Sequence, residues 1–149
     1  MSLSKFLKET FGFLSFFAWK QLPWEEFCKV YRQRTLQEII QSGYFLGCYE
    51  SALALYERAK KRGFYPRFLE MVSLESWVAE DGKEDGIVSH CYIELLVNRM
   101  KILIDPTQCQ VLFNFPPDMV LFSEGAYAWA SFDEFHEAQK RFVREGFRG

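Results

Sequence analysis

The chain has 149 residues, of which 49% are hydrophobic and 18% aromatic, and its formal net charge is −2. This length fits one domain over residues 1–149, and the apolar content can offset the entropy of ordering the chain, which excludes an intrinsically disordered protein. The balanced charge lacks the positive excess that nucleic-acid binding requires, so we expect no nucleic-acid partner. The sequence gives no indication of oligomeric state.

The residues that bind metals in proteins are few and scattered. Cysteines occur at positions 28, 48, 91 and 109, and histidines at 90 and 136. The close pairs of a zinc site are missing, and the acidic run 80–85 lacks the spacing of a calcium loop. We therefore expect no metal and no cofactor. A chain that can build a core does not need disulfides, so reduced thiols and a cytoplasmic location are expected.

The first 34 residues predict a helical N-terminal extension. Dense apolar residues between 4 and 20 can share one helical face, and residues 24–40 suggest one or two short helices after Pro23. The apolar run 11–19 is too short to cross a bilayer as a helix. We expect this extension to pack on the domain without stable membrane insertion.

Residue Cys48 stands at the start of a strong helical pattern. A turn at 41–43 precedes it, and Ala52, Leu55 and Ala59 follow at helical spacing before Gly63 ends the run. This pattern places the Cys48 thiol at or near a helix N-terminus.

The second half of the chain indicates strands and one last helix. A strand is expected from about 67 to 74, a solvated charged turn over 80–86, and a hairpin of 87–97 with 100–104 about Asn98-Arg99. One or two edge strands are expected within 111–130. A C-terminal helix over 131–147 should be capped by Ser131, with Phe132, Phe135, Gln139 and Phe142 on its docking face.

Cys48 has the candidate partners that an activated thiol needs. A thiol attacks a carbonyl as thiolate, and a histidine held by a carboxylate is the usual base. His90 is the histidine on a predicted core strand, and Asp105 ends its predicted partner strand. A turn centred near residues 97 and 98 would place His90 and Asp105 opposite each other as cross-strand neighbours.

Four segments in this order resemble the successive motifs of the transglutaminase-like branch of the papain-like superfamily, over about residues 35–110. They are Ser42-Gly43-Tyr44-Phe45-Leu46-Gly47-Cys48, Gly63-Phe64-Tyr65-Pro66-Arg67, His90-Cys91-Tyr92-Ile93-Glu94 and Asp105-Pro106-Thr107. The resemblance implies an α+β fold in which the nucleophile helix packs on an antiparallel sheet, with extra N-terminal and C-terminal helices here. It also implies that Cys48 is the nucleophile, His90 its base and Asp105 the residue that orients the base.

The remaining candidate residues have weaker patterns. Gln41 could supply an oxyanion donor, and the backbone N–H of Cys48 is the other candidate. The other cysteines are interpreted as structural, with Cys91 on the strand face opposite His90. His136 is interpreted as a surface or core-edge histidine, because only the solvated Glu134 and Glu137 lie near it in sequence.

These observations predict thiol-dependent acyl transfer or hydrolysis at an amide or peptide carbonyl of a protein or peptide substrate. Water as the acceptor would make the protein a cysteine peptidase or amidase, and an amine would make it a transglutaminase. The alternative is a catalytically idle papain-like domain that serves as a protein-binding module. The pKa of the Cys48 thiol discriminates the two hypotheses, because an idle domain has no need of a thiolate.

Overall fold

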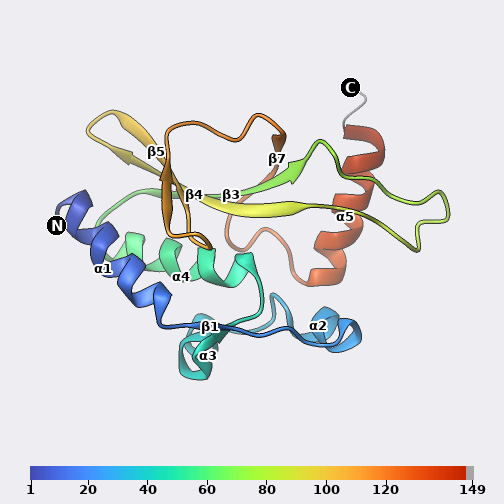
Figure 1. Cartoon of the computed structure of the whole chain (residues 1–149), viewed down its shortest axis with the longest axis horizontal. Coiled ribbons are helices and arrows are strands. Elements are labelled where there is room, and N and C mark those ends of the chain that lie inside the picture. Colours follow the sequence, from blue (N-terminus) through green and yellow to red (C-terminus); the bar gives the residue numbers. More distant parts are fainter. Residues whose placement is uncertain (147–149) are drawn as a thin grey trace.

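The computed structural model describes residues 1–146, and within this range the chain forms five helices and seven strands (Figure 1). The helices are α1 (Leu3–Ser15), α2 (Trp24–Val30), α3 (Leu36–Ser42), α4 (Cys48–Lys61) and α5 (Phe132–Glu145). The strands are β1 (Ala18–Trp19), β2 (Tyr44–Phe45), β3 (Pro66–Ser73), β4 (Ser89–Val97), β5 (Met100–Asp105), β6 (Gln110–Leu112) and β7 (Met119–Glu124).

A five-stranded sheet forms the centre of the molecule. Its order is β6-β5-β4-β3-β7, and every neighbouring pair is antiparallel. Helix α4 packs across β3 and β4 on one face, and α1 lies along α4 (Figure 1). The predicted α+β class, with the helix that begins at Cys48 packed on an antiparallel sheet, is confirmed.

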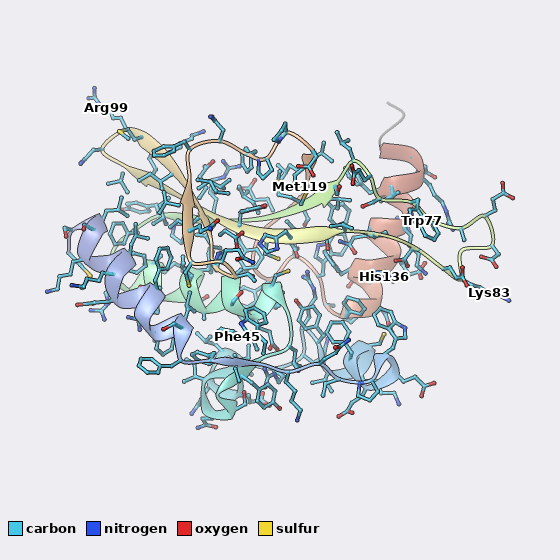
Figure 2. All side chains as sticks on the ribbon, viewed as in Figure 1. Phe45, Trp77, Lys83, Arg99, Met119 and His136 are labelled. Carbon is cyan, nitrogen blue, oxygen red and sulfur yellow. The ribbon has the colours of Figure 1, made fainter. Side chains whose placement is uncertain are left out.

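The main core lies between α4 and the sheet. The α4 residues Ala52, Leu55 and Ala59, predicted to share one helical face, are fully buried. They pack with strand residues such as Phe68 and Ile93. Apolar burial of this kind stabilises a fold by about 25 cal/mol per Å², so it fixes α4 firmly to β3 and β4. In Figure 2, Phe45 lies within the body of the molecule, whereas Lys83 and Arg99 mark two projecting loops.

The predicted hairpin about Asn98-Arg99 is confirmed, but its register differs from the predicted one. Asn98 and Arg99 have φ angles of 49° and 68°, as a tight two-residue hairpin turn requires. Strand pairing joins Val97 to Met100 and continues to Ile93 with Ile104, which brings Asp105 level with residue 92. The predicted direct opposition of His90 and Asp105 was therefore wrong by two residues. Because two residues is one side-chain period, both side chains remain on the same face.

The terminal elements follow the predictions closely. Helix α1 is shorter than the predicted 4–20 and buries Phe6, Thr10 and Leu14. One or two edge strands were expected within 111–130, and two are present, β6, which begins at residue 110, and β7. In α5, Ser131 caps the helix by accepting a hydrogen bond from the Glu134 N–H. Position 147 of the predicted C-terminal helix lies outside the described residues.

Candidate active site

The Cys48 thiol stands at the first residue of α4, and the backbone around it is held by Tyr31. The Tyr49 N–H donates to the Tyr31 hydroxyl at 2.8 Å, and the Tyr49 hydroxyl donates to the Ala126 carbonyl at 2.6 Å. A Cβ at Gly47 would lie 2.4 Å from the Tyr31 hydroxyl oxygen, so only glycine fits there. The start of α4 is thus fixed from both sides of Cys48.

A buried ion pair holds the segment that leads into α4. The Arg34 Nε donates to Glu50 at 2.9 Å, and a second carboxylate contact comes from the Leu46 N–H at 2.7 Å. The same guanidinium donates to the Tyr44 carbonyl at 2.9 Å. These bonds connect β2 to the first turn of α4, and they fix the direction in which Cys48 enters the helix.

The structure brings His90 and Asp105 together. His90 Nε2 lies 2.8 Å from Asp105 Oδ1. The same carboxylate oxygen accepts the backbone N–H groups of Thr107 at 3.0 Å and Gln108 at 3.2 Å. Because Nε2 donates to Asp105, the other ring nitrogen, Nδ1, is the one left to face Cys48. This is the arrangement that the sequence predicted for a base and its orienting acid.

The electrostatics of Cys48 and His90 are those of an ion pair. Burial by itself lowers the pKa of His90, but hydrogen bonds with Asp105 and Cys48 outweigh it and raise the pKa to about 10. A hydrogen bond with Cys91 lowers the pKa of Cys48 well below its usual value, and His90 lowers it further against the opposing effect of burial. Both shifts favour the thiolate form of Cys48 and the imidazolium form of His90.

A second cysteine touches the candidate nucleophile. Cys91 Sγ lies 3.7 Å from Cys48 Sγ and 3.7 Å from Glu70 Oε1. Glu70 forms a buried ion pair with Arg32, whose guanidinium lies over the Phe135 ring. Cys91 is buried in the core between α4 and the sheet. Its interpretation as a purely structural residue did not anticipate the contact with Cys48.

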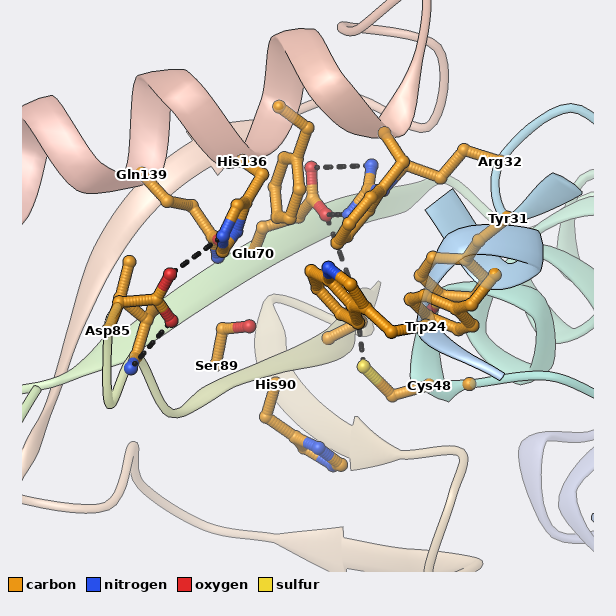
Figure 3. Close-up of a pocket in the computed structure, with 16 residues that line it drawn as sticks. Trp24, Tyr31, Arg32, Cys48, Glu70, Asp85, Ser89, His90, His136 and Gln139 are labelled. Carbon is orange, nitrogen blue, oxygen red and sulfur yellow. Dashed lines mark hydrogen bonds and ion pairs between the residues drawn. The ribbon is translucent and has the colours of Figure 1, made fainter. Parts of the chain in front are cut away.

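Cys48 and His90 open onto a cavity of about 300 Å³ (Figure 3). Helices α2 and α5 supply its aromatic walls, and the start of β4 supplies one edge. Gln41 is exposed on α3 and does not line this cavity, so the structure does not bring it to the other three predicted residues. The lining residues are Trp24, Phe27, Tyr31, Arg32, Gly47, Cys48, Glu70, Asp85, Ile87, Ser89, His90, Cys91, Phe132, Phe135, His136 and Gln139.

His136 has a partner that sequence proximity did not indicate. His136 Nε2 lies 2.8 Å from Asp85 Oδ2, 51 residues away in the chain, and both side chains are less than one-fifth exposed. The interpretation of His136 as a surface or core-edge histidine agrees with its intermediate burial, but no local pattern indicated its partner Asp85. The expectation that Asp85 belongs to a solvated turn was wrong, because its side chain is largely buried in this pair. The packing of α5 against the loop before β4 creates this pair.

The comparisons bear on the fold. No model of a known protein family matches the sequence, and no curated protein matches it either. Among solved structures, calcium-bound LapG of Legionella pneumophila is similar to this chain, with a TM-score of 0.61 and 14% identity over 95% of this chain and 81% of LapG. The fold is papain-like, of the transglutaminase-like type. At this identity the similarity concerns the papain-like fold alone.

Residues 1–146 contain neither a clustered metal site nor a membrane-spanning helix. Within this range no group of three or more His, Cys, Asp or Glu side chains could hold a metal ion. No helix in the same range is both long enough and apolar enough to cross a membrane. The four cysteines are free thiols, and Cys91 is the one that is fully buried.

Proposed function

We propose that this protein is a cysteine-dependent hydrolase or acyltransferase that acts on an amide or peptide carbonyl through Cys48, His90 and Asp105. One observation carries the proposal. The His90 ring donates to Asp105 at 2.8 Å through Nε2 and interacts through its remaining side with a thiol at the start of a helix. A histidine so placed can hold a thiolate before attack and return a proton to the leaving group afterwards.

The reaction follows from this geometry. The Cys48 thiolate attacks the carbonyl carbon, and the carbonyl electron pair moves to the oxygen. When the C–N bond breaks, the His90 imidazolium gives its proton to the leaving amine, and an acyl-thioester remains on Cys48. A water or amine that loses its proton to His90 then releases the acyl group. Asp105 keeps the imidazole in the required tautomer and orientation throughout.

Two donors near Cys48 can stabilise the oxyanion. The Cys48 N–H is the first of α4, and the first N–H groups of a helix have no partner within it. The Tyr31 hydroxyl accepts the Tyr49 N–H, and its own proton remains to donate. Burial raises the pKa of Tyr31 well above its ordinary value, so this hydroxyl stays protonated. We therefore assign the oxyanion role to these two groups in place of Gln41.

The pH dependence of iodoacetamide alkylation, with peptide mapping of the labelled cysteine, tests the proposal. Cys28 and Cys109 are internal controls, because burial raises the pKa of each. Cys48 should react fastest, with a midpoint well below the value of about 8.5 for a free thiol, and it should lose this advantage in His90→Ala. Peptide substrates can then be screened under reducing conditions, as suits a cytoplasmic enzyme.

The same experiment decides against the alternative of an idle binding module. Such a domain has no requirement for a thiolate, so a Cys48 that titrates like Cys28 would refute the proposed enzyme. The His136→Ala variant is the matched control, since His136 also lines the cavity but its ring nitrogen contacts Asp85. Its Cys48 should keep the midpoint of the unmodified protein.

A further inference from the structure

The cavity beside Cys48 extends well beyond the reacting groups. Figure 3 shows Gln139, His136 and Asp85 at one side of it, and Cys48 at the other. The aromatic walls between them would accept the methylene groups of a side chain. Nothing in the proposed chemistry of Cys48 and His90 uses the far end of this cavity, so its polar groups need another explanation.

Two residues that line this cavity each carry a buried nitrogen atom without a hydrogen-bond partner. Among the described residues, Arg32 Nε and Gln139 Nε2 are the buried side-chain polar atoms without one, and both residues line the cavity. The Gln139 side chain is on α5, and the residue is only 2% exposed. A buried donor without an acceptor is destabilising by about 1–3 kcal/mol. Because both atoms are N–H donors, each of them is complemented by a hydrogen-bond acceptor.

The charged residues that line the cavity indicate which kind of ligand group it can bind. Glu70 and Asp85 line the same space, and each already has its cationic or imidazole partner, Arg32 for Glu70 and His136 for Asp85. A ligand carboxylate would add a third negative group near these two, and the Arg32 charge is already neutralised by Glu70. A ligand ammonium would repel Arg32 and leave the Gln139 N–H without an acceptor. The favoured ligand group is an uncharged carbonyl.

A carboxamide fits this end better than any other uncharged carbonyl. Its oxygen can accept the Gln139 Nε2 donor, and its NH₂ group can donate to the Asp85 carboxylate or the Ser89 hydroxyl on the same cavity wall. A ketone or ester would satisfy the donor and leave those acceptors unused. A side chain with methylene groups followed by a carboxamide is that of glutamine or asparagine.

We infer that this cavity is the specificity pocket for a glutamine or asparagine side chain of the substrate. Gln139 donates a hydrogen bond to the carboxamide oxygen of that side chain. The inference rests on the proposed function of Cys48. Since Gln139 and Cys48 are at opposite sides of the cavity, the carboxamide in the pocket is distinct from the carbonyl that Cys48 attacks (Figure 3). The glutamine or asparagine that occupies the cavity is therefore a substrate residue at or close to the bond that Cys48 cleaves.

Short peptidyl vinyl sulfones, which add covalently to an active-site thiolate, test the inference. Two series of three probes are compared, and the probes within a series differ only in carrying Gln, Met or Glu at one position. That position is next to the vinyl sulfone in the first series and one residue further away in the second. The rate of Cys48 labelling is followed by mass spectrometry. Iodoacetamide is the control, because it reports the reactivity of the thiol without a side chain that binds in the cavity. In one series the Gln probe should react at least about tenfold faster than the Met and Glu probes, as the loss of one buried hydrogen bond implies.

Variants at position 139 identify the residue responsible. In Gln139→Leu the preference for Gln over Met should fall to about one or reverse, because the donor is gone, while the iodoacetamide rate stays unchanged. Gln139→Glu keeps the size and removes the donor, so it should lose the preference as well if the leucine variant does not fold. Gln37→Leu makes the same substitution at an exposed position of α3 and should behave like the unmodified protein.

The outcomes separate the pocket from the proposed function. Equal rates for the three probes, a faster Glu probe, or a Gln preference that survives in both Gln139 variants would overturn the inference while Cys48 remains reactive to iodoacetamide. Equal rates for the Gln, Met and Glu probes would mean that a water molecule, and no ligand group, accepts the hydrogen bond of Gln139 Nε2. If Cys48 of the unmodified protein is inert to iodoacetamide itself, the proposed function fails, and the specificity pocket fails with it.

Discussion

His90 and Asp105 form a 2.8 Å hydrogen bond although the hairpin register does not place them opposite each other. They are diagonal neighbours on one face of β4 and β5, two residues from direct opposition. The hydrogen bond closes where β5 ends, and there the carboxylate also accepts two backbone N–H groups from the turn after Asp105. The turn thus holds the acid, and the acid holds the imidazole.

Removing the carboxylate should lower the pKa of His90. In Asp105→Asn the ring loses the hydrogen bond that contributes most to its raised pKa, and the pKa should fall from about 10 toward the ordinary value of about 6.5. NMR titration of the His90 ring measures this directly. The exposed Asp81→Asn is the control and should leave the titration unchanged. A His90 pKa that stays near 10 in Asp105→Asn would contradict the assigned orienting role.

Cys91 should act on the acidity of Cys48. The contact between their sulfur atoms, at 3.7 Å, is the largest cause of the lowered pKa of Cys48. In Cys91→Ala this sulfur contact is lost, so the midpoint of Cys48 alkylation should move upward by about one pH unit, equal to about 1.4 kcal/mol. Cys91→Ser keeps a hydroxyl that can hydrogen-bond with Cys48, and it should restore part of the shift. Equal midpoints in the three proteins would show that Cys91 serves packing alone.

The coupled charges predict a particular pH dependence of stability. The lowered pKa of Cys48 and the raised pKa of His90 favour a thiolate and an imidazolium in the folded protein at pH 7 to 8, whereas the unfolded chain has a thiol and a neutral imidazole, given ordinary pKa values of about 8.5 and 6.5. The folded and unfolded states then bind the same number of protons at these two residues. The pair therefore adds no pH dependence to the free energy of unfolding between about pH 6.5 and 8.5.

Removal of the Cys48 thiol should reveal how His90 by itself changes the free energy of unfolding with pH. In Cys48→Ala the folded state holds one more proton than the unfolded state wherever His90 stays protonated by Asp105. Its raised pKa then stabilises the fold below about pH 6.5, and the stabilisation is lost as pH rises toward the folded pKa, by up to about 1.4 kcal/mol per pH unit. Urea unfolding between pH 6 and 9 measures this. A Cys48→Ala profile parallel to that of the unmodified protein would refute the ion pair.

The Glu70–Arg32 ion pair should matter greatly for stability. Both side chains are at most 4% exposed, so Glu70→Ala leaves the Arg32 cation buried without its partner. The expected loss is about 3–5 kcal/mol in the free energy of unfolding. Glu124→Ala removes the carboxylate from an exposed pair with Arg67 and should cost at most about 1 kcal/mol. Urea denaturation of both variants checks the contrast, and similar losses would contradict it.

A methyl group at position 47 should disturb the start of α4. The Cβ of Gly47→Ala would meet the Tyr31 ring and hydroxyl, and the resulting overpacking should be destabilising by about 1–3 kcal/mol and slow the alkylation of Cys48. Gly12→Ala is the matched control, because no atom lies within 4 Å of its Cβ. Within helix α1 it should stabilise the protein by about 0.5–1 kcal/mol. Thermal unfolding compares the two, and a neutral Gly47→Ala would refute the packing argument.

The sequence by itself determined the elements and the three residues proposed to react. Apolar spacing defined α4, alternation and a two-residue turn defined β4 and β5, and four motif blocks placed Cys48, His90 and Asp105 on them. These signals are local, because helix and strand periodicity is written into neighbouring residues. The hairpin register was missed by two residues, since the turn geometry that sets it depends on the φ angles of Asn98 and Arg99.

Only the tertiary structure decided which distant groups surround the thiol. Cys91 reaches Cys48, and Glu70 reaches Cys91, because α4 crosses the sheet above them. Asp85 meets His136 because α5 packs against the loop before β4. Gln41 was excluded for the same reason, since α3 presents it to solvent. Contacts between residues far apart in the chain arise from the packing of whole elements, which no local pattern encodes.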